Sequence, residues 1–178
     1  MPSSRPKALT FALLICFLPA APVAAHVTLA QGQAAPGTFY KAVFQVPHGC
    51  GESTTVRIQV TIPEGVLMVK PMAKPEWQVA VTRATYSKPY SYLRGAKFTE
   101  GVAEVIWSGK LPNELYDEFA LTTFISSDLA SGTTLYFPVI QTCEKGEHRW
   151  IEIPAATQSE RPSEPAPSLK LAPKETQQ

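Results

Sequence analysis

Only three histidines occur in this chain, His26, His48 and His148, and the first of them is placed to do metal chemistry. His26 directly follows the small residues VAA, which are typical of a signal-peptidase site. Cleavage after Ala25 would free the α-amine of His26, and this amine and the imidazole Nδ1 would then chelate one ion. Such nitrogen donors suit copper(II), which lies at the top of the divalent affinity series. We interpret His26 as a copper ligand; the alternative is the frayed first residue of an exported protein.

The cysteines also favour export. Cys16 lies inside the predicted leader, which leaves the even pair Cys50 and Cys143 in the mature chain. In an oxidising compartment two cysteines so far apart in the sequence predict a disulfide. The alternative is a two-cysteine metal site, although the close CxxC spacing of such sites is missing.

Four further residues are candidate ligands or neighbours of a metal. His48 and Glu52 flank the first cysteine of that pair in VPHGCGES. His148 and Trp150 lie two apart in EHRWIEI, so they share one face of a strand. The disulfide would bring the His48 loop close to the Trp150 hairpin, and we therefore treat these residues as one site. The alternative for His48 and Glu52 is a solvated loop.

The remaining soft and aromatic side chains are predicted to be structural. Met68 and Met72 are soft enough to suit copper(I), but two methionines in a non-helical segment more often pack. Trp77 and Trp107 are predicted core residues.

No motif of a catalytic family is present. The sequence lacks GxSxG, a P-loop, HExxH and the Rossmann glycine pattern. Removal of the leader takes Arg5 and Lys7 from the 16 basic residues, leaving 14 against 15 acidic ones. A net charge near −1 gives no electrostatic reason to expect binding to nucleic acid or to an anionic membrane.

Three segments are expected along the chain. Residues 1–25 have a basic start, an apolar run too short for a membrane span and a small-residue site, which together predict a signal peptide. Residues 26–153 are long enough for one domain with its own core. Residues 154–178 are rich in Pro, Ser, Glu and Gln without an aromatic residue, and this composition predicts a disordered tail. We expect no membrane span after cleavage.

The sequence of residues 26–153 predicts a series of β-strands. Short runs of alternating or β-prone residues are separated by turn residues and lack a helical stripe, at residues 39–46, 55–62, 77–83, 102–107, 116–125, 134–140 and 149–153. Seven such strands predict an all-β, antiparallel sandwich of the immunoglobulin or fibronectin type III kind. A barrel is the alternative.

Several short motifs together resemble the YcnI-like copper-binding domain. They are AHVTL, VPHGC followed by TT, IPEGV, the PxW ending at Trp77, the WxGxL starting at Trp107, and QTCEKGEHRWIEIP, and they span residues 26–154. The resemblance implies an exported fibronectin-like sandwich that holds copper(II) in a single-histidine brace at the mature N-terminus. In the family a glutamate and a tryptophan complete the site.

The resemblance assigns roles to individual residues. His26 matches the brace histidine, and Trp150 matches the tryptophan. The glutamate position corresponds to Gln59, a neutral and poorer ligand, so the resemblance leaves His48 or Glu52 to supply the missing donor, and we favour His48. It also implies periplasmic or extracellular copper trafficking, buffering or delivery, with another copper protein as a partner, and no catalysis. The alternatives are a metal-free interaction module and a copper-dependent oxygenase in which His26 acts with His48 or His148.

Overall fold

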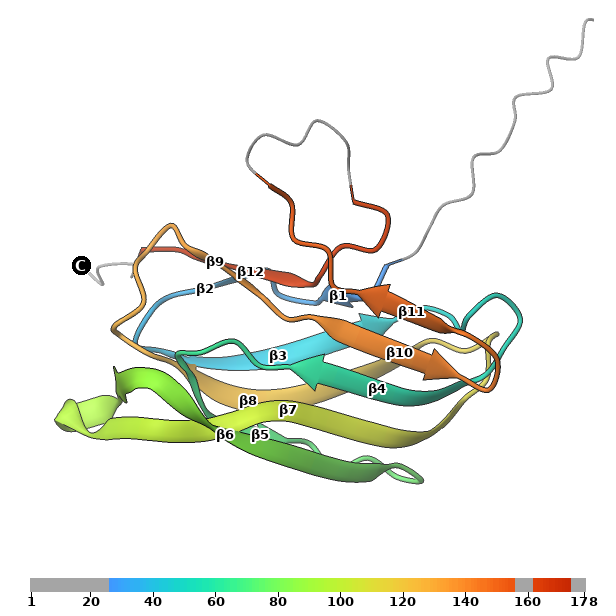
Figure 1. Cartoon of the computed structure of the whole chain (residues 1–178), viewed down its shortest axis with the longest axis horizontal. Helices are drawn as coiled ribbons and strands as arrows, with labels where there is room; N and C mark the ends of the chain where they lie inside the picture. Colours follow the sequence, from blue (N-terminus) through green and yellow to red (C-terminus); the bar gives the residue numbers. More distant parts are fainter. Residues whose placement is uncertain (1–25, 156–161, 174–178) are drawn as a thin grey trace, which may run out of the picture.

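The chain forms a β-sandwich in a computed structural model that describes residues 26–155 and 162–173 (Figure 1). The predicted leader, residues 1–25, lies outside the described residues. The strands are β1 (Thr28–Leu29), β2 (Gln33–Ala34), β3 (Phe39–Val46), β4 (Thr55–Thr61), β5 (Val66–Pro71), β6 (Gln78–Ser91), β7 (Lys97–Leu111), β8 (Asp117–Ile125), β9 (Thr134–Tyr136), β10 (Val139–Cys143), β11 (Glu147–Trp150) and β12 (Ser168–Leu171). A single 3-10 turn, Leu93–Gly95, connects β6 to β7.

Two large sheets build the sandwich. One has the order β1-β3-β8-β5, and the other has the order β11-β10-β4-β7-β6. A smaller sheet, β2-β12-β9, lies beside them, and its β12–β2 pairing is parallel whereas the other pairings between strands are antiparallel. The prediction of an all-β sandwich is confirmed, and the separate edges of the two sheets rule out the alternative of a closed arrangement.

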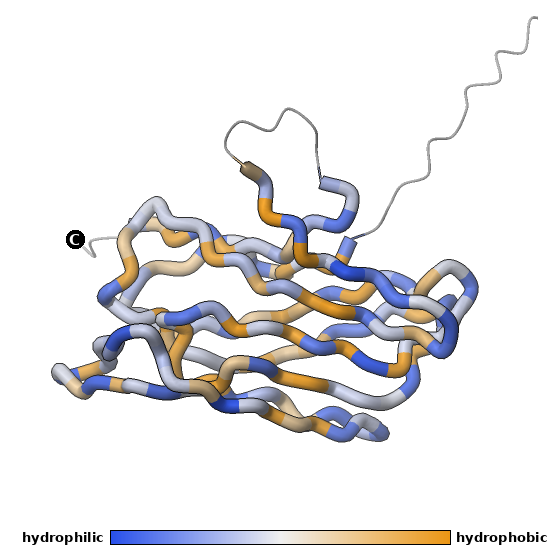
Figure 2. Tube along the Cα trace, viewed as in Figure 1, coloured by the Kyte–Doolittle hydropathy of each residue, from blue (hydrophilic) through white to orange (hydrophobic). Residues whose placement is uncertain are grey.

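The core lies between the two large sheets. Strand residues alternate between buried and solvent-facing positions, as Ile58 and Val60 do on β4. Aromatic rings contact one another across the core: Trp107 from β7 meets Phe119 from β8 with ring centroids 5.6 Å apart. Figure 2 shows hydrophilic and hydrophobic segments alternating along the strands, and a hydrophilic loop between β10 and β11.

The WxGxL motif has a packing reason. Trp107 is fully buried, as predicted, while Gly109 two residues later lies under the half-buried ring of Trp77. A side chain at Gly109 would collide with that ring, so the motif leaves room for one tryptophan while it buries the other.

Some predicted strands differ from those observed. The run at residues 134–140 is divided into β9 and β10, because Pro138 has no N–H to donate to a ladder. The strands predicted at residues 77–83 and 102–107 are longer and form the β6–β7 hairpin. Strand β5 was not predicted, because a bulge at Met68, where φ is 55°, interrupts its alternation.

The prediction of a disordered tail is wrong for residues 162–173, and with it the domain boundary at residue 153. Strand β12 pairs with β2 and β9, and Leu169 and Leu171 are fully buried in the main core. A composition averaged over the whole segment hid the four residues SLKL, whose strict alternation suits a strand with one buried face.

No helix within residues 26–155 and 162–173 is long and apolar enough to cross a membrane.

Candidate metal site

The candidate site lies at one end of the sandwich, where three parts of the chain meet. Strand β1 pairs with the end of β3, with Thr28 opposite Gln45, so His26 lies beside the turn that follows β3. That turn carries His48. Strand β11 supplies His148 and Trp150 from the neighbouring sheet.

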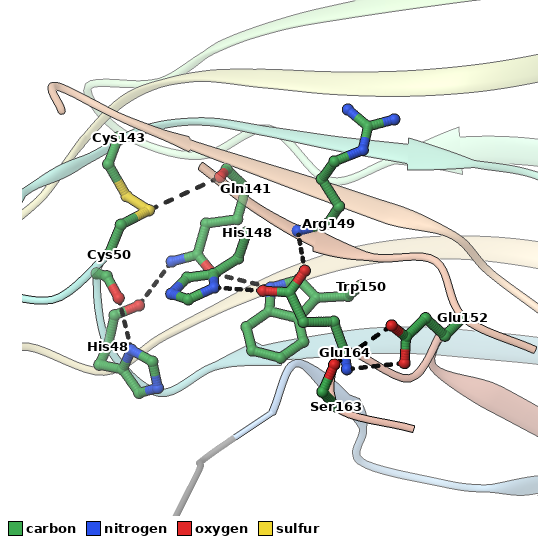
Figure 3. Close-up of polar contacts among 11 residues, drawn as sticks. His48, Cys50, Gln141, Cys143, His148, Arg149, Trp150, Glu152, Ser163 and Glu164 are labelled. Carbon is green, nitrogen blue, oxygen red and sulfur yellow. Dashed lines mark hydrogen bonds and ion pairs between the residues drawn. A yellow bond between two sulfur atoms is a disulfide. The ribbon is translucent and has the colours of Figure 1, made fainter. Parts of the chain in front are cut away.

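The three histidines and Trp150 are linked by ring contacts. The His26 ring meets the indole edge-on with centroids 5.5 Å apart, and the His148 ring stacks on it at 4.9 Å. His48 lies next, with its ring centroid 6.1 Å from that of His148 (Figure 3). The prediction that the His48 loop and the Trp150 hairpin lie together is therefore confirmed.

The disulfide between Cys50 and Cys143 is present, as predicted, with a Cα–Cα distance of 6.0 Å. It joins the turn after His48 to the end of β10. Gly49 makes the turn possible, because a side chain at that position would collide with the backbone oxygen of Ser53.

The buried side chain of Gln141 connects the elements of the site by hydrogen bonds. Its Oε1 accepts a hydrogen bond from Trp150 Nε1 at 3.1 Å. Its Nε2 donates to the backbone oxygen of His48 at 2.6 Å and to Thr55 Oγ1 at 2.8 Å. The side chain is fully buried, so losing any of these bonds would leave a polar group without water. Gln141 therefore fixes both the indole and the His48 backbone.

Gln141 was not predicted as a site residue, although a signal for it existed. The turn at Lys145-Gly146 makes β10 and β11 a hairpin in which Gln141 is opposite His148. Counting back from that turn would have placed Gln141 on the face of His148 and Trp150.

Glu164 is the second residue that the sequence reasoning missed. Its Oε1 lies 2.6 Å from His148 Nδ1, and its Oε2 accepts from the Arg149 backbone N–H at 2.9 Å. Partial burial acts to raise the pKa of Glu164, but the hydrogen bonds from His148 and Arg149 outweigh it, so the pKa falls below its ordinary value. The residue lies in the segment predicted to be disordered, which is why it was missed.

Gln59 is not part of this cluster. Its antiparallel neighbour on β10 is Ile140, whereas Trp150 pairs with Val139, and consecutive strand residues face opposite sides of a sheet. The Gln59 side chain bonds Arg57 and Glu104 at 2.8 Å each, in a polar row on the outer face. The prediction that Gln59 stands at the ligand position beside Trp150 is therefore wrong, because the Gln59 side chain is on the opposite face of the sheet from Trp150.

Glu52 also lies apart from the histidines. It is exposed in the turn between Cys50 and Ser53 and lines a shallow hollow with Glu144 and Lys145. The structure therefore brings His26, His48 and Trp150 together through ring contacts, whereas Glu52 lines the hollow with Glu144 and Lys145.

Met68 and Met72 were predicted to be packing residues, but both side chains are exposed. Met68 is 39% exposed and Met72 is 50% exposed, both on or next to edge strand β5.

The donor set of this end suits copper. Three imidazoles and the α-amine that cleavage would free are nitrogen donors, which copper accepts. Within residues 26–155 and 162–173, however, no three His, Cys, Asp or Glu side chains stand close enough together to hold one ion. His26 would therefore depend on its own amine, or on movement of a neighbour, to complete a copper(II) site.

These features define a class of protein: an immunoglobulin-like β-sandwich that carries a histidine and tryptophan cluster at one end. One solved structure with this fold is an uncharacterized protein from Nocardia farcinica, described as having an immunoglobulin-like fold. It is 27% identical over 83% of this chain and 98% of its own, with a TM-score of 0.59. A comparison with curated proteins gave no match.

Residues 26–171 match the family described as a domain of unknown function, DUF1775, and the chain belongs to that family. It is the family of the YcnI-like domain, which the sequence motifs resemble. The matched range ends at the last residue of β12, in agreement with the corrected domain boundary.

Proposed function

We propose that the mature chain is an exported protein that binds copper(II) at His26 and buffers or delivers the ion outside the cytoplasm. The observation that supports this most is that His26 and His148 both contact Trp150, and that His48 lies beside His148, at the end of the domain where the mature chain would begin.

In this proposal the free amine and the imidazole of His26 hold the ion. Trp150 contacts the His26 ring and shields one side of it. The indole is in turn fixed by Gln141, so the shield keeps one orientation. His48 remains the preferred further donor, since Glu52 and Gln59 lie elsewhere.

Delivery to another periplasmic copper protein is the proposed use of the bound ion. Reduction of the ion by an external electron donor would favour release, because copper(I) prefers softer and fewer ligands than copper(II). We propose a binding role and no catalytic one, since the sequence carries none of the catalytic motifs GxSxG, P-loop, HExxH and the Rossmann glycine pattern.

A copper(II) titration followed by electron paramagnetic resonance tests the proposal. The chain is expressed with its leader, and intact mass establishes that the mature form begins at His26. We expect one tight site with nitrogen couplings, lost in His26→Ala and also lost when one extra residue precedes His26.

The matched control is Glu52→Gln, which changes a charged side chain near the same loops without touching the cluster. It should bind copper(II) as the unchanged chain does. Equal copper(II) binding by the chain with one extra residue before His26 would overturn the brace. The lack of any tight copper(II) site in the mature chain would favour a metal-free interaction module.

A further inference from the structure

Strand β6 forms one edge of the five-stranded sheet. In the part of the chain that the structure describes, β7 is its only neighbour, and Figure 1 shows β6 along the lower border of the molecule. Every residue from 78 to 85 is exposed, including Val79 at 36% and Val81 at 47%. An exposed edge strand presents unpaired backbone N–H and C=O groups, which can pair with another strand.

The other edges of the two large sheets carry features that oppose strand pairing. Strand β1 is two residues long, and β11 is four residues long and carries two charges. Strand β5 has a bulge at Met68 and ends in Lys70 and Pro71. Short length, charge, proline and bulges are the usual protections of natural sheet edges. Strand β6 is 14 residues long, and over Gln78–Thr82 it has no charge, no proline and no register shift.

The register of the sheet indicates which backbone groups of β6 are free. The Ile62 N–H donates to the Ala103 oxygen at 2.8 Å, so Ala103 and the odd-numbered residues that follow it on β7 face β4. The even-numbered residues of β7 therefore bond β6, where Ile106 is opposite Ala80. The N–H and C=O groups of the two valines, on either side of Ala80, consequently point to the free edge.

The side chains of the two valines extend the core face of the sheet beyond its edge. Val79 is opposite Trp107 and Val81 is opposite Val105, and both of these β7 residues are fully buried. Met72 adds apolar surface beside them, because its backbone oxygen lies 3.5 Å from Trp107 Nε1 while its side chain is 50% exposed. This side of the sandwich therefore has both free backbone groups and uncovered apolar side chains.

We propose that β6 pairs antiparallel with β6 of a second copy of the chain, about a twofold axis at Ala80. In this register Val79 of each copy is opposite Val81 of the other, and Gln78 is opposite Thr82. The valine pairs use the backbone groups that face the free edge, so each pair exchanges two hydrogen bonds. The two five-stranded sheets would become one continuous sheet.

The pairing continues an apolar row across the axis. The row runs from Trp107 through Val79 of one copy to Val81 and Val105 of the second copy. Directly opposite apolar side chains on one face stabilise an antiparallel pair. The paired segment is short, so the interface is small, and we expect a dissociation constant on the order of 10 µM.

The charges of the strand favour a second copy as the partner. Arg83 is the one charged residue in residues 78–87, and its guanidinium already bonds Glu100 at 3.0 Å. The register about Ala80 places it opposite Trp77 of the second copy, where an arginine is favourable, and not opposite a second Arg83. Because the contact is the same on both copies, it occupies both β6 edges and closes at a dimer.

Sedimentation velocity of the mature, disulfide-intact chain, at concentrations on both sides of the expected dissociation constant, tests the pairing. We expect one reversible step from monomer to dimer. Val81→Lys should raise the dissociation constant by more than about 10-fold, because a charge on the strand edge opposes pairing. The matched control is Ile153→Lys, the same kind of change at a 55% exposed residue just after β11, on the opposite edge of the sheet. It should dimerise as the unchanged chain does, and near-ultraviolet circular dichroism verifies that both variants fold.

Cysteine substitution tests the register. The two copies of Ala80 would form a non-hydrogen-bonded pair with Cα atoms about 4.5 Å apart, within the range of a disulfide. Ala80→Cys should therefore give a covalent dimer on mild oxidation, seen by non-reducing electrophoresis, with the Cys50–Cys143 bond verified by peptide mapping. Thr82→Cys is the control, because its two copies would lie on the order of 14 Å apart and should not cross-link.

Three results would contradict the proposal: a dimer that survives Val81→Lys, a cross-link through Thr82→Cys in place of Ala80→Cys, or a chain that stays monomeric throughout. The last result would leave the β6 edge to a strand of a different protein. None of them bears on the copper(II) proposal, because β6 and β11 are opposite edges of their sheet.

Discussion

The two ends of the sandwich are held together by different kinds of contact. The histidine end uses a disulfide and a fully buried amide, Gln141, with three hydrogen bonds. The far end, where the β6–β7 hairpin extends beyond the sheet (Figure 1), is tied to the body by surface carboxylates and by a small hydrophobic cluster of Leu67, Tyr90 and Phe124. Glu64 accepts hydrogen bonds from the Ser87 N–H and hydroxyl and from the Tyr90 hydroxyl, and Asp128 accepts one from the Ser91 N–H.

The difference has an energetic meaning. Water and salt compete with exposed carboxylates, so such contacts stabilise weakly. A buried amide has no water to replace a lost partner, and a disulfide constrains the unfolded chain at any ionic strength. The histidine end is therefore expected to be rigid and sensitive to substitution, whereas substitution of the exposed carboxylates at the hairpin end is expected to be tolerated.

The largest effect should follow removal of the disulfide. Replacing Cys50 and Cys143 by serine frees a loop with a sequence separation of 93 residues. The chain-entropy model assigns about 4–5 kcal/mol to a loop of this size. Urea unfolding of the double variant and the unchanged chain measures the difference; a loss below 1 kcal/mol would show that the histidine end does not depend on this constraint.

The next largest effect concerns β12, which follows Glu164 in the chain and buries its leucines in the core. Leu169→Ala removes a fully buried side chain and should cost about 3 kcal/mol of unfolding free energy. Lys170→Ala, on the exposed face of the same strand, is the matched control and should change it by less than about 0.5 kcal/mol. Equal effects of the two changes in urea unfolding would contradict the packing of β12.

Substitution of two glutamines, Gln141 and Gln59, compares the stability cost of losing hydrogen bonds on the buried and the outer face of one sheet. Gln141→Leu leaves Trp150 Nε1 and the His48 oxygen without their partner and should cost about 2–3 kcal/mol. Gln59→Leu breaks only half-exposed contacts on the outer face, with a cost below about 1 kcal/mol. Thermal unfolding ranks the two, and a shift in tryptophan fluorescence should accompany Gln141→Leu alone. The reverse ranking would mean that the buried amide does not organise the site.

The smallest effect should come from Glu64→Gln at the hairpin end. Hydrogen bonds from the Ser87 side chain and backbone lower the pKa of Glu64 below 4.5. A lowered pKa in the folded chain means that the ionised carboxylate stabilises the fold above pH 4.5 and that this contribution is lost as the pH falls through the lowered value. The melting temperature of the variant should therefore lie slightly below that of the unchanged chain at pH 7, and the gap should close under acid. A gap that widened at low pH would contradict this assignment.

The sequence predicted most of the fold because its strands follow a local rule. The alternation of Val56, Ile58 and Val60 needs only their order in the chain to indicate which face is buried. The disulfide and the meeting of the His48 loop with the Trp150 hairpin followed from the cysteine count and the predicted export, and both contacts are confirmed. The same local reasoning failed for Leu169 and Leu171, because four alternating residues are few against a long polar and proline-rich background.

By itself the sequence determined the type of fold, the pairing of its two cysteines and the candidate role of its histidines. Tertiary structure alone decided which polar side chains meet those histidines. Gln141 and Glu164 reach the site, and Gln59 and Glu52 do not, because strand parity and the return of β12 to the sandwich direct these side chains. A metal ligand acts only through distance and direction in space, and long-range pairing sets both.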